Sequence, residues 1–260
     1  LGINTGIAEG SRLGGTCVNK GCIPKKLYSF ASHYSDELNL MRSFGWQINK
    51  SKFSWNKLVK NKKKEISRLN DIYQNLLENS KVKIFKGYAE FVDQNTLKVG
   101  KTYIESKKIL ISVGTKPREL NQFSNVNLLS SDEAFDLKKL PKNILIMGGG
   151  YIAIEFASIF NGLGVNTSLC IRRKRILSDF DEEISKFLMQ QMQEKGIQII
   201  VEDFPKQIEL KEKSYKVFFK NKIRRFETVM GALGRVPNIS KLKIENAKIK
   251  LNLNGAIQTD

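Results

Sequence analysis

Two cysteines lie close together near the start of the chain, in the segment GGTCVNKGCIPKK (residues 14–26). Pro24 is preferred in the first turn of a helix, which predicts that a helix begins near Cys22. The Cys22 thiol would then lie at the positive end of the helix dipole and close to Lys25 and Lys26, and both effects stabilise a thiolate. One stabilised thiolate beside a second thiol, Cys17, suits thiol–disulfide exchange.

Three other interpretations of this pair are possible. A structural disulfide would close a very small loop and add little stability. A zinc site would need further ligands, and the sequence offers only His33 and Cys170, so no metal is expected. Two inert buried cysteines would leave the surrounding glycines and lysines unexplained. We interpret Cys170 as a small core residue and His33 as a residue on the face of the helix after Cys22.

A second pattern, GGGYIA (residues 148–153), follows an apolar stretch at 144–147 and opens an apolar helix at 151–163. It fits G-x-G-x-x-A between a strand and a helix, which is typical of a dinucleotide site. Gly148 permits the tight turn, Gly150 lets the backbone approach a pyrophosphate, and Ala153 lets the helix pack closely on the sheet. The alternative is a glycine turn that only packs helix on sheet.

The residues after the next predicted strand, 167–171, indicate which nucleotide is bound. An NAD site places Asp or Glu there, on the ribose 2′-hydroxyl. This chain has Arg172, then Arg173, Lys174 and Arg175, and arginine can bind a 2′-phosphate with two hydrogen bonds. The position therefore favours NADPH, although a solvated basic cluster is the simpler alternative.

Around these motifs the hydrophobic pattern predicts an α/β fold. A strand at 5–8 ends in Glu9, and helices are expected at 22–40 and 55–77. A linker at 130–141 holds one helical turn, and the βαβ unit follows it. The other expected elements are strands at 82–85, 88–92, 96–99, 102–104, 109–113, 197–201, 215–219 and 228–233 and a helix at 181–195.

The composition is that of a globular chain with an excess of positive charge. The 260 residues carry a formal charge of +18, and 41% are hydrophobic. No apolar run approaches the ~18 residues of a membrane span. Lys60, Lys62, Lys63 and Lys64 fall mostly on the solvated side of the helix at 55–77. We interpret the charge as compositional and expect no nucleic-acid partner; the alternative, a basic non-enzymatic binding module, predicts strongly salt-dependent binding to nucleic acid.

The cysteine segment resembles the redox-active motif of class I pyridine nucleotide-disulfide oxidoreductases. The resemblance extends to the strand end at Glu9, SVGTKP (112–117), GGGYIAIEFA (148–157) and GALGRVPN (231–238). Lys25-Lys26 and SRLNDIYQN (67–75) are most similar to the glutathione reductase type, and the large thioredoxin reductases are the alternative. One departure is Ser178, which stands where NADPH-dependent relatives usually have a second arginine; Arg173 or Arg175 could compensate.

The resemblance implies the cofactors FAD and NADPH and the substrate glutathione disulfide. Cys17 and Cys22 would be the catalytic pair, with Lys25 and Glu155 as an ion pair beside the flavin, and Tyr73 would line the glutathione site. The implied cofactor-binding residues are Glu9, Gly15, Thr16, Lys25, Gly114, Gly148, Gly150, Tyr151, Ile152, Glu155, Arg172, Arg175, Gly234 and Arg235.

The implied architecture is two Rossmann-like dinucleotide-binding domains: an FAD domain over 1–140, an NADPH domain over 141–235, and the start of a return to the FAD domain over 236–260. The family's first FAD turn would precede Leu1, and its dimerisation domain with a catalytic His–Glu pair would follow Asp260. The FAD domain is therefore expected to be incomplete and discontinuous. We expect an inactive, poorly soluble internal fragment of a cytoplasmic homodimer; a flavin-free remnant is the alternative.

Overall fold

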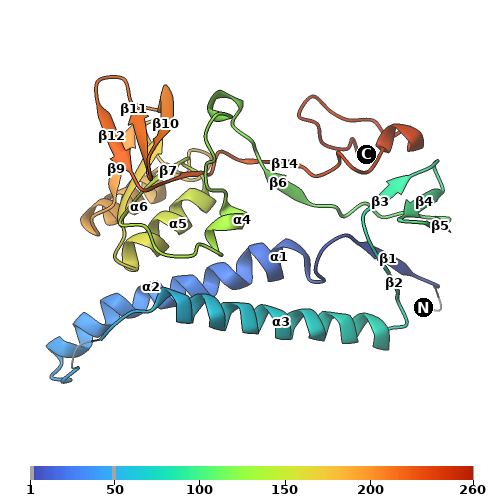
Figure 1. Cartoon of the computed structure of the whole chain (residues 1–260), viewed down its shortest axis with the longest axis horizontal. Coiled ribbons are helices and arrows are strands. Elements are labelled where there is room, and N and C mark those ends of the chain that lie inside the picture. The colour runs from blue at the N-terminus through green and yellow to red at the C-terminus, as the bar shows by residue number, and fades with distance from the viewer. Residues whose placement is uncertain (1–2, 49–50, 260) are drawn as a thin grey trace. The chain divides into compact units, whose positions relative to one another are not determined.

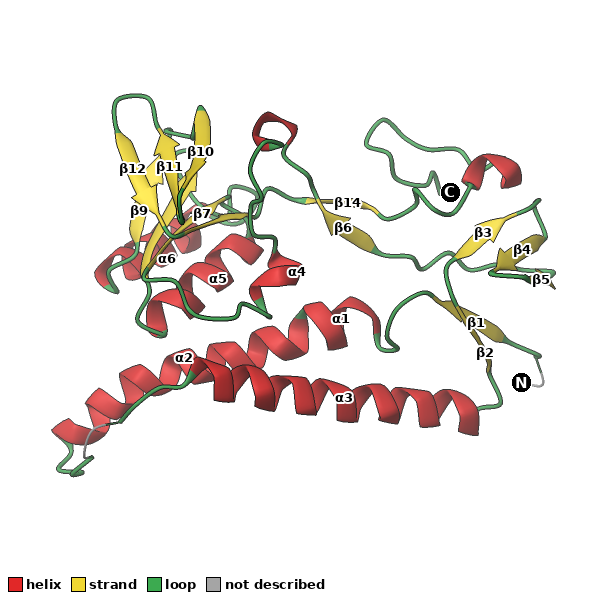
Figure 2. Cartoon of the chain, viewed as in Figure 1, coloured by secondary structure: helices red, strands yellow, loops and turns green. Residues whose placement is uncertain are grey.

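The computed structural model describes residues 3–48 and 51–259, which contain both helices and strands (Figures 1 and 2). The mixed α/β class predicted from the sequence is confirmed. The chain packs into two compact units. One contains Leu1–Cys22, Lys64–Lys116 and Arg235–Asp260, and the other contains Ile23–Lys63 and Pro117–Gly234. The functional domains at 1–140, 141–235 and 236–260 stay a prediction.

The larger unit, Ile23–Lys63 with Pro117–Gly234, is built on a parallel sheet of four strands. In spatial order these are β13 (Thr228–Gly231), β7 (Asn143–Met147), β8 (Asn166–Ile171) and β9 (Gln198–Val201). Ile144 and Ile146 of β7 face one core, and Leu145 and Met147 face another. Burial of both faces explains the continuous apolar run, and the strand order reverses between β13 and β7, where sheets of this kind bind ligands.

Helices and aromatic side chains cover one face of this sheet. Figure 2 shows α5 (Tyr151–Gly162) beside the sheet strands, and α5 supplies much of the core on this side. Tyr28 packs edge-on against Trp55 and Phe135, with ring centroids 5.0 and 5.6 Å apart. The Tyr28 hydroxyl donates to the Phe135 carbonyl at 2.6 Å, and its burial raises the pKa of the phenol. These contacts explain why residues 23–63 pack with the sheet unit.

The remaining helices of the chain have the following bounds. They are α1 (Gly15–Lys20), α2 (Cys22–Ser43), α3 (Trp55–Asn79), α4 (Ser131–Ala134) and α6 (Glu182–Glu194), with 3₁₀ turns η1 (Asn121–Phe123) and η2 (Ile244–Ala247). Helix α3 runs through both units.

An antiparallel meander covers the other face of the parallel sheet. Its strands are β10 (Gln207–Lys211), β11 (Ser214–Phe218) and β12 (Ile223–Phe226). Ile208 and Val217 of this meander join Leu145 and Cys170 in one buried cluster. Cys170 is fully buried, and burial raises the pKa of its thiol, so its interpretation as a core residue is confirmed.

The other unit contains short sheets and a small core. Strand β1 (Gly6–Glu9) pairs in parallel with β2 (Lys83–Lys86), and β6 (Thr115–Pro117) pairs with β14 (Arg235–Pro237). Phe91, Leu242 and Ile244 form its core. A three-stranded antiparallel sheet contains β3 (Ala89–Phe91), β4 (Thr96–Val99) and β5 (Thr102–Glu105).

One prediction about these elements was wrong. Residues 109–113 form no strand; Ile109 and Ile111 alternate because they pack against the core around Phe91, without a hydrogen-bonded neighbour strand in the described chain.

The prediction that the lysines of α3 lie mostly on its solvated side is confirmed by Lys60, Lys63 and Lys64. Lys62 is the exception, because its side chain is only 4% exposed and its ammonium lies 2.9 Å from a carboxylate oxygen of Asp136. Lys63 also reaches Asp136, at 3.3 Å.

The Lys62–Asp136 pair leads to a prediction about stability. Burial alone would raise the pKa of Asp136, but hydrogen bonds and charges from Lys62 and Lys63 outweigh burial and lower it. In the protein that carries this chain, Asp136→Asn leaves the buried ammonium without its carboxylate and lowers the free energy of unfolding by about 1–2 kcal/mol, a value reduced because Asp136 is half-exposed. Urea titration measures this change.

The matched controls are Lys63→Ala and Lys62→Met. The first removes an exposed partner and changes the stability by less than ~0.5 kcal/mol, and the second replaces a buried charge with an apolar side chain at little cost. Because the folded pKa of Asp136 is lowered, the pair's contribution is present above the ordinary carboxyl pKa and is lost as pH falls through the lowered one. Equal losses in Asp136→Asn and Lys63→Ala would contradict this account.

Candidate functional site

The two cysteines are positioned by two consecutive helices. Cys17 lies in the short helix α1, and Cys22 is the first residue of α2, where the sequence predicted a helix to begin. Gly14 and Gly15, at the start of α1, have φ of +97° and +60°, a left-handed backbone that favours glycine. Gly21 separates the two helices, and a Cβ there would lie 3.0 Å from the Thr16 carbonyl oxygen. The glycines of the motif therefore serve the backbone of this loop.

Two asparagines that the sequence analysis did not select hold the loop in place. The Asn19 side-chain amide donates to the carbonyls of Leu13 and Gly15 at 3.0 and 2.9 Å. Asn70, on α3, donates to the Leu13 carbonyl at 2.8 Å and to the Asn19 side-chain oxygen at 3.0 Å. Asn19 lies between the cysteines, but Asn70 is 51 residues away and no local signal marks it.

The cysteines are free thiols at the surface, and they interact with each other. A hydrogen bond with Cys22, burial, and the charge of Cys22 together raise the pKa of the Cys17 thiol. Protonated Cys17 therefore persists to higher pH than an ordinary cysteine thiol does. The two thiols are thus close enough for Cys22 to change the ionisation of Cys17, as thiol–disulfide exchange within a pair requires.

The structure brings together two residues that the family resemblance paired. The Lys25 ammonium lies 2.8 Å from a carboxylate oxygen of Glu155, and both side chains are about one-third exposed (31% and 36%). Lys25 is on α2, three residues after Cys22, and Glu155 is on α5. Such a pair adds at most about 1 kcal/mol to stability. Its main effect is to hold the Lys25 ammonium in a fixed place. Its role beside a flavin stays a prediction.

The glycine turn after β7 is shaped to admit a ligand. Gly148 has φ of +139°, and a Cβ there would lie 2.3 Å from the Ala232 carbonyl oxygen. Gly150 is the N-cap of α5, and a Cβ on it would meet no atom within 4 Å. Open space therefore lies before the first free N–H groups of a 12-residue helix, as a pyrophosphate requires. Tyr151, on the same turn, is 60% exposed, and Ile152 packs partly against the core.

The basic residues after β8 have different surroundings. The Arg172 guanidinium lies over the Phe204 ring, 4.4 Å from its centroid. Arg175 instead donates to backbone carbonyls of its own loop, those of Ser178 at 3.0 Å and Phe180 at 3.1 Å. Arg172 thus presents an exposed cation, whereas Arg175 is engaged within the loop.

The other predicted site residues belong mostly to the unit that contains β1. Glu9 ends β1, and its carboxylate accepts from the Ser11 amide at 2.8 Å. Arg235 donates to the side-chain and carbonyl oxygens of Thr115 at 2.8 and 2.7 Å. Gly114, Gly15, Thr16 and Tyr73 lie in the same unit, and Gly234 ends the sheet unit.

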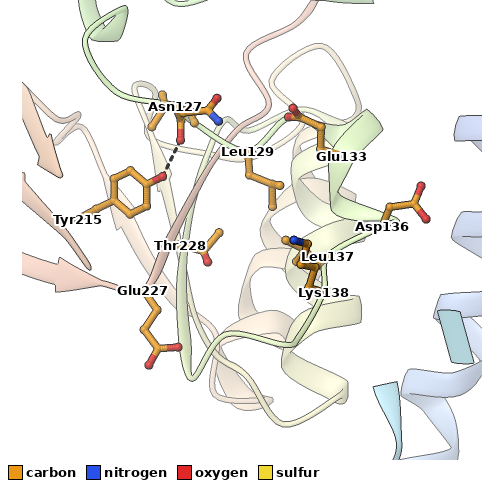
Figure 3. A pocket seen from close by; sticks show the side chains of 10 residues that line it. Asn127, Leu129, Glu133, Asp136, Leu137, Lys138, Tyr215, Glu227 and Thr228 are labelled. Atoms are coloured by element: carbon orange, nitrogen blue, oxygen red, sulfur yellow. Dashed lines mark hydrogen bonds between the residues drawn. The ribbon is translucent and has the colours of Figure 1, made fainter. Parts of the chain in front are cut away.

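A hollow in the sheet unit is lined by none of the predicted site residues. It measures about 330 Å³, and its lining includes Asn127, Glu133, Tyr215 and Glu227 (Figure 3). The Tyr215 hydroxyl donates to the Asn127 carbonyl at 2.6 Å, and burial raises the pKa of the phenol. The side chains of Glu133 and Glu227 likewise accept from backbone amides, those of Ser130 and Lys142, so these polar groups are used in structural hydrogen bonds.

Residues 3–48 and 51–259 lack the features of a metal site and of a membrane span. No group of three or more His, Cys, Asp and Glu side chains among them could hold a metal ion. No helix in these described ranges is both long and apolar enough to cross a membrane.

Comparison with known proteins places these features in context. The family model described as pyridine nucleotide-disulphide oxidoreductase matches residues 2–260. The chain is 38% identical to a glutathione reductase of Burkholderia cepacia, over all of this chain and 58% of the relative. It is 39% identical to the chloroplastic/mitochondrial glutathione reductase of Pisum sativum, over 95% of this chain and 46% of the relative. The chain therefore spans about half the length of these relatives.

Two further matches widen this picture. A trypanothione reductase of Trypanosoma congolense is 33% identical over 95% of this chain and 54% of the relative. The solved structure of the HOCl-induced flavoprotein disulfide reductase RclA from Escherichia coli matches with a TM-score of 0.88 and 25% identity, over 100% of this chain and 57% of that one.

The thiol pair leads to a prediction about pH. In the reduced protein, Cys22→Ala removes both the hydrogen bond and the charge that raise the pKa of Cys17. The alkylation midpoint of Cys17 therefore moves to lower pH, and its rate with iodoacetamide at pH 8 rises because more of the thiol is ionised. The rise is only about two- to fivefold, because a lower pKa also makes the thiolate less nucleophilic. Peptide mass spectrometry measures the rate at each cysteine.

Two controls separate the causes. Cys22→Ser keeps a hydroxyl for the hydrogen bond and loses the charge, so it has an intermediate effect. Cys170→Ala removes a buried thiol and leaves the Cys17 profile unchanged. A slower reaction of Cys17 in Cys22→Ala would show that Cys22 lowers, and does not raise, the pKa of its neighbour.

Proposed function

Because the chain belongs to the pyridine nucleotide-disulphide oxidoreductase family, we propose that the protein carrying it reduces a disulfide with electrons from NADPH. The observation that carries this proposal is the arrangement of Cys17 and Cys22 on consecutive helices, exposed and interacting with each other. Two exposed thiols that are hydrogen-bonded to each other are poorly suited to a structural role and well suited to cycling between dithiol and disulfide.

The thiol chemistry follows from the difference between the two sulfurs. The Cys17 sulfur, as a thiolate, attacks one sulfur of the substrate disulfide, forming a mixed disulfide and releasing the first thiol product. The Cys22 thiolate then attacks the Cys17 sulfur, forming the Cys17–Cys22 disulfide and releasing the second product. The dithiol loses two electrons and the substrate gains two, so the cycle closes only when a cofactor reduces the new disulfide.

The glycine turn and the basic loop are the proposed NADPH site. Gly148 and Gly150 leave room for a pyrophosphate at the N-terminus of α5, and Arg172 offers an exposed guanidinium after β8. Tyr151 stands exposed at the same helix terminus, where it would meet the nicotinamide half.

Residues of the other unit fit FAD, which would pass electrons between the nicotinamide and the cysteine pair when bound. Glu9 ends a parallel strand, the position from which a carboxylate binds a ribose. Gly15 and Gly114 both have positive φ and carry no side chain that would block a flavin. In the sheet unit, the Lys25 ammonium lies 2.8 Å from Glu155, and the family resemblance assigns this ion pair to the flavin.

Glutathione disulfide is the proposed substrate. Two of the relatives described above are named glutathione reductases, and Tyr73 is exposed on α3 for substrate contact. The formal charge of +18 also favours anionic small molecules. A disulfide of the trypanothione type and thioredoxin are the competing substrates. We further propose a homodimer acting in a reducing compartment such as the cytoplasm.

The test measures NADPH oxidation at 340 nm by the protein that carries this chain. We expect turnover with glutathione disulfide, and a loss of at least about 10³-fold in Cys17→Ser and in Cys22→Ser because the two thiols act as one unit. Cys170→Ala is the matched cysteine control and keeps full turnover.

The outcomes distinguish mechanism from substrate. Reduction of glutathione disulfide by the double variant without Cys17 and Cys22 overturns the thiol mechanism. Turnover with thioredoxin but not with glutathione disulfide keeps the mechanism and replaces the substrate. Salt-dependent binding to nucleic acid, without NADPH oxidation, would favour a basic binding module instead.

A further inference from the structure

The loop between β8 and α6, residues 172–181, is ordered by its own hydrogen bonds and by the glycine turn. Leu177 has φ of +46°, and its amide donates to the Gly149 carbonyl at 2.7 Å. The Phe180 amide donates back to the Leu177 carbonyl at 2.9 Å. Asp181 ends the loop by accepting from the Ile184 amide at 3.1 Å, which caps α6. The loop is therefore tied to the turn before α5.

Arg175 holds the inside of this loop. Besides the carbonyls of Ser178 and Phe180, its guanidinium lies 3.4 Å from the hydroxyl of Ser185, which is fully buried. That hydroxyl in turn lies 2.7 Å from the Asp181 carbonyl. With its donors engaged in this way, Arg175 sets the shape of the loop, and the exposed cations are those of its neighbours.

Arg173 is one of these exposed cations, and its guanidinium already has an anionic neighbour, Asp179. Its Nη1 contacts the Ser178 hydroxyl and lies 3.4 Å from a carboxylate oxygen of Asp179. The Ser178 hydroxyl lies 3.3 Å from the same oxygen of Asp179. The Arg173 and Asp179 side chains are 69% and 89% exposed, so an anion from solution can reach the Arg173 guanidinium and take the place of Asp179.

We propose that Asp179 is a specificity-determining residue that weakens the hold of this loop on a nucleotide 2′-phosphate by competing for Arg173. A phosphate bound by Arg172 and Arg173 must displace the Asp179 carboxylate and lie near its negative charge. A nucleotide with a free 2′-hydroxyl neither displaces the Asp179 carboxylate nor is repelled by its charge. The inference rests on the proposed function, since it deepens the NADPH site.

The expected change in phosphate affinity is small because Arg173 and Asp179 are both exposed to solvent. An ion pair between solvent-exposed groups is weak and screened by salt, so removing it changes phosphate binding by a modest factor of about three to ten. The double negative charge of a phosphate places the effect in the upper part of that range at low salt. The same physics predicts that the effect fades at high ionic strength.

The experiment compares Asp179→Asn with the unsubstituted protein by calorimetry, using 2′,5′-ADP and 5′-AMP as probes. We expect 2′,5′-ADP to bind about three- to tenfold more tightly in the variant, with 5′-AMP unchanged. In turnover the KM for NADPH falls with kcat unchanged, and the NADPH-to-NADH ratio of kcat/KM rises by the same factor. In 0.5 M salt the gain shrinks.

Two further variants test the route of the effect. Glu183→Gln removes an exposed negative charge of α6 just beyond the loop, and it leaves the ratio of the two affinities unchanged. In an Arg173→Gln background, Asp179→Asn no longer improves 2′,5′-ADP binding, because the competed cation is absent. An equal gain in either comparison overturns the proposal.

The remaining outcomes separate this inference from the proposed function. Binding of 2′,5′-ADP that Asp179→Asn does not alter, or a gain of equal size for 5′-AMP, overturns the inference alone. A protein that binds neither probe and oxidises no NADPH overturns the proposed function, and this inference with it.

Discussion

The short turn between β7 and α5 is bonded on three sides. The Gly148 amide donates to the Cys170 carbonyl of β8 at 2.9 Å, and the Gly149 carbonyl accepts from Leu177 at 2.7 Å. Next to the turn, the Ala232 amide donates to the Met147 carbonyl at 2.8 Å. Two strands and the basic loop thus meet where a side chain at 148 would collide with backbone. Anything that moved this turn would move the helix terminus and the loop together.

Helix α2 imposes a second constraint, because it fixes the spacing between Cys22 and Lys25 along the chain. Its first residue is Cys22, and Lys25 follows one turn later. A helix is stiff over such a distance, so a sulfur and an ammonium are kept in register without any direct bond between them. The glycines, Asn19 and Asn70 then fix the loop that carries the second sulfur. The positions of both sulfurs are therefore set by backbone order.

The sequence was informative where the signal is local. The family resemblance is confirmed over residues 2–260, and Pro24 and the glycines correctly predicted where α2 and the βαβ unit begin. Local patterns could not show that Lys62 is buried, because its partner Asp136 is 74 residues away. They also missed α1, which is too short for a periodic pattern, and the meander strands β10 and β12. At 109–113, alternation reflected packing against a small core and not a strand.

The burial of Cys170 beneath the meander has a practical consequence. The chain has three cysteines, and the folded protein shields one of them while exposing the other two. A maleimide dye added to the native protein is therefore directed to the helix junction without any engineered substitution. The extent of labelling would report whether the pair is reduced, because a Cys17–Cys22 disulfide does not react with the dye and Cys170 is buried.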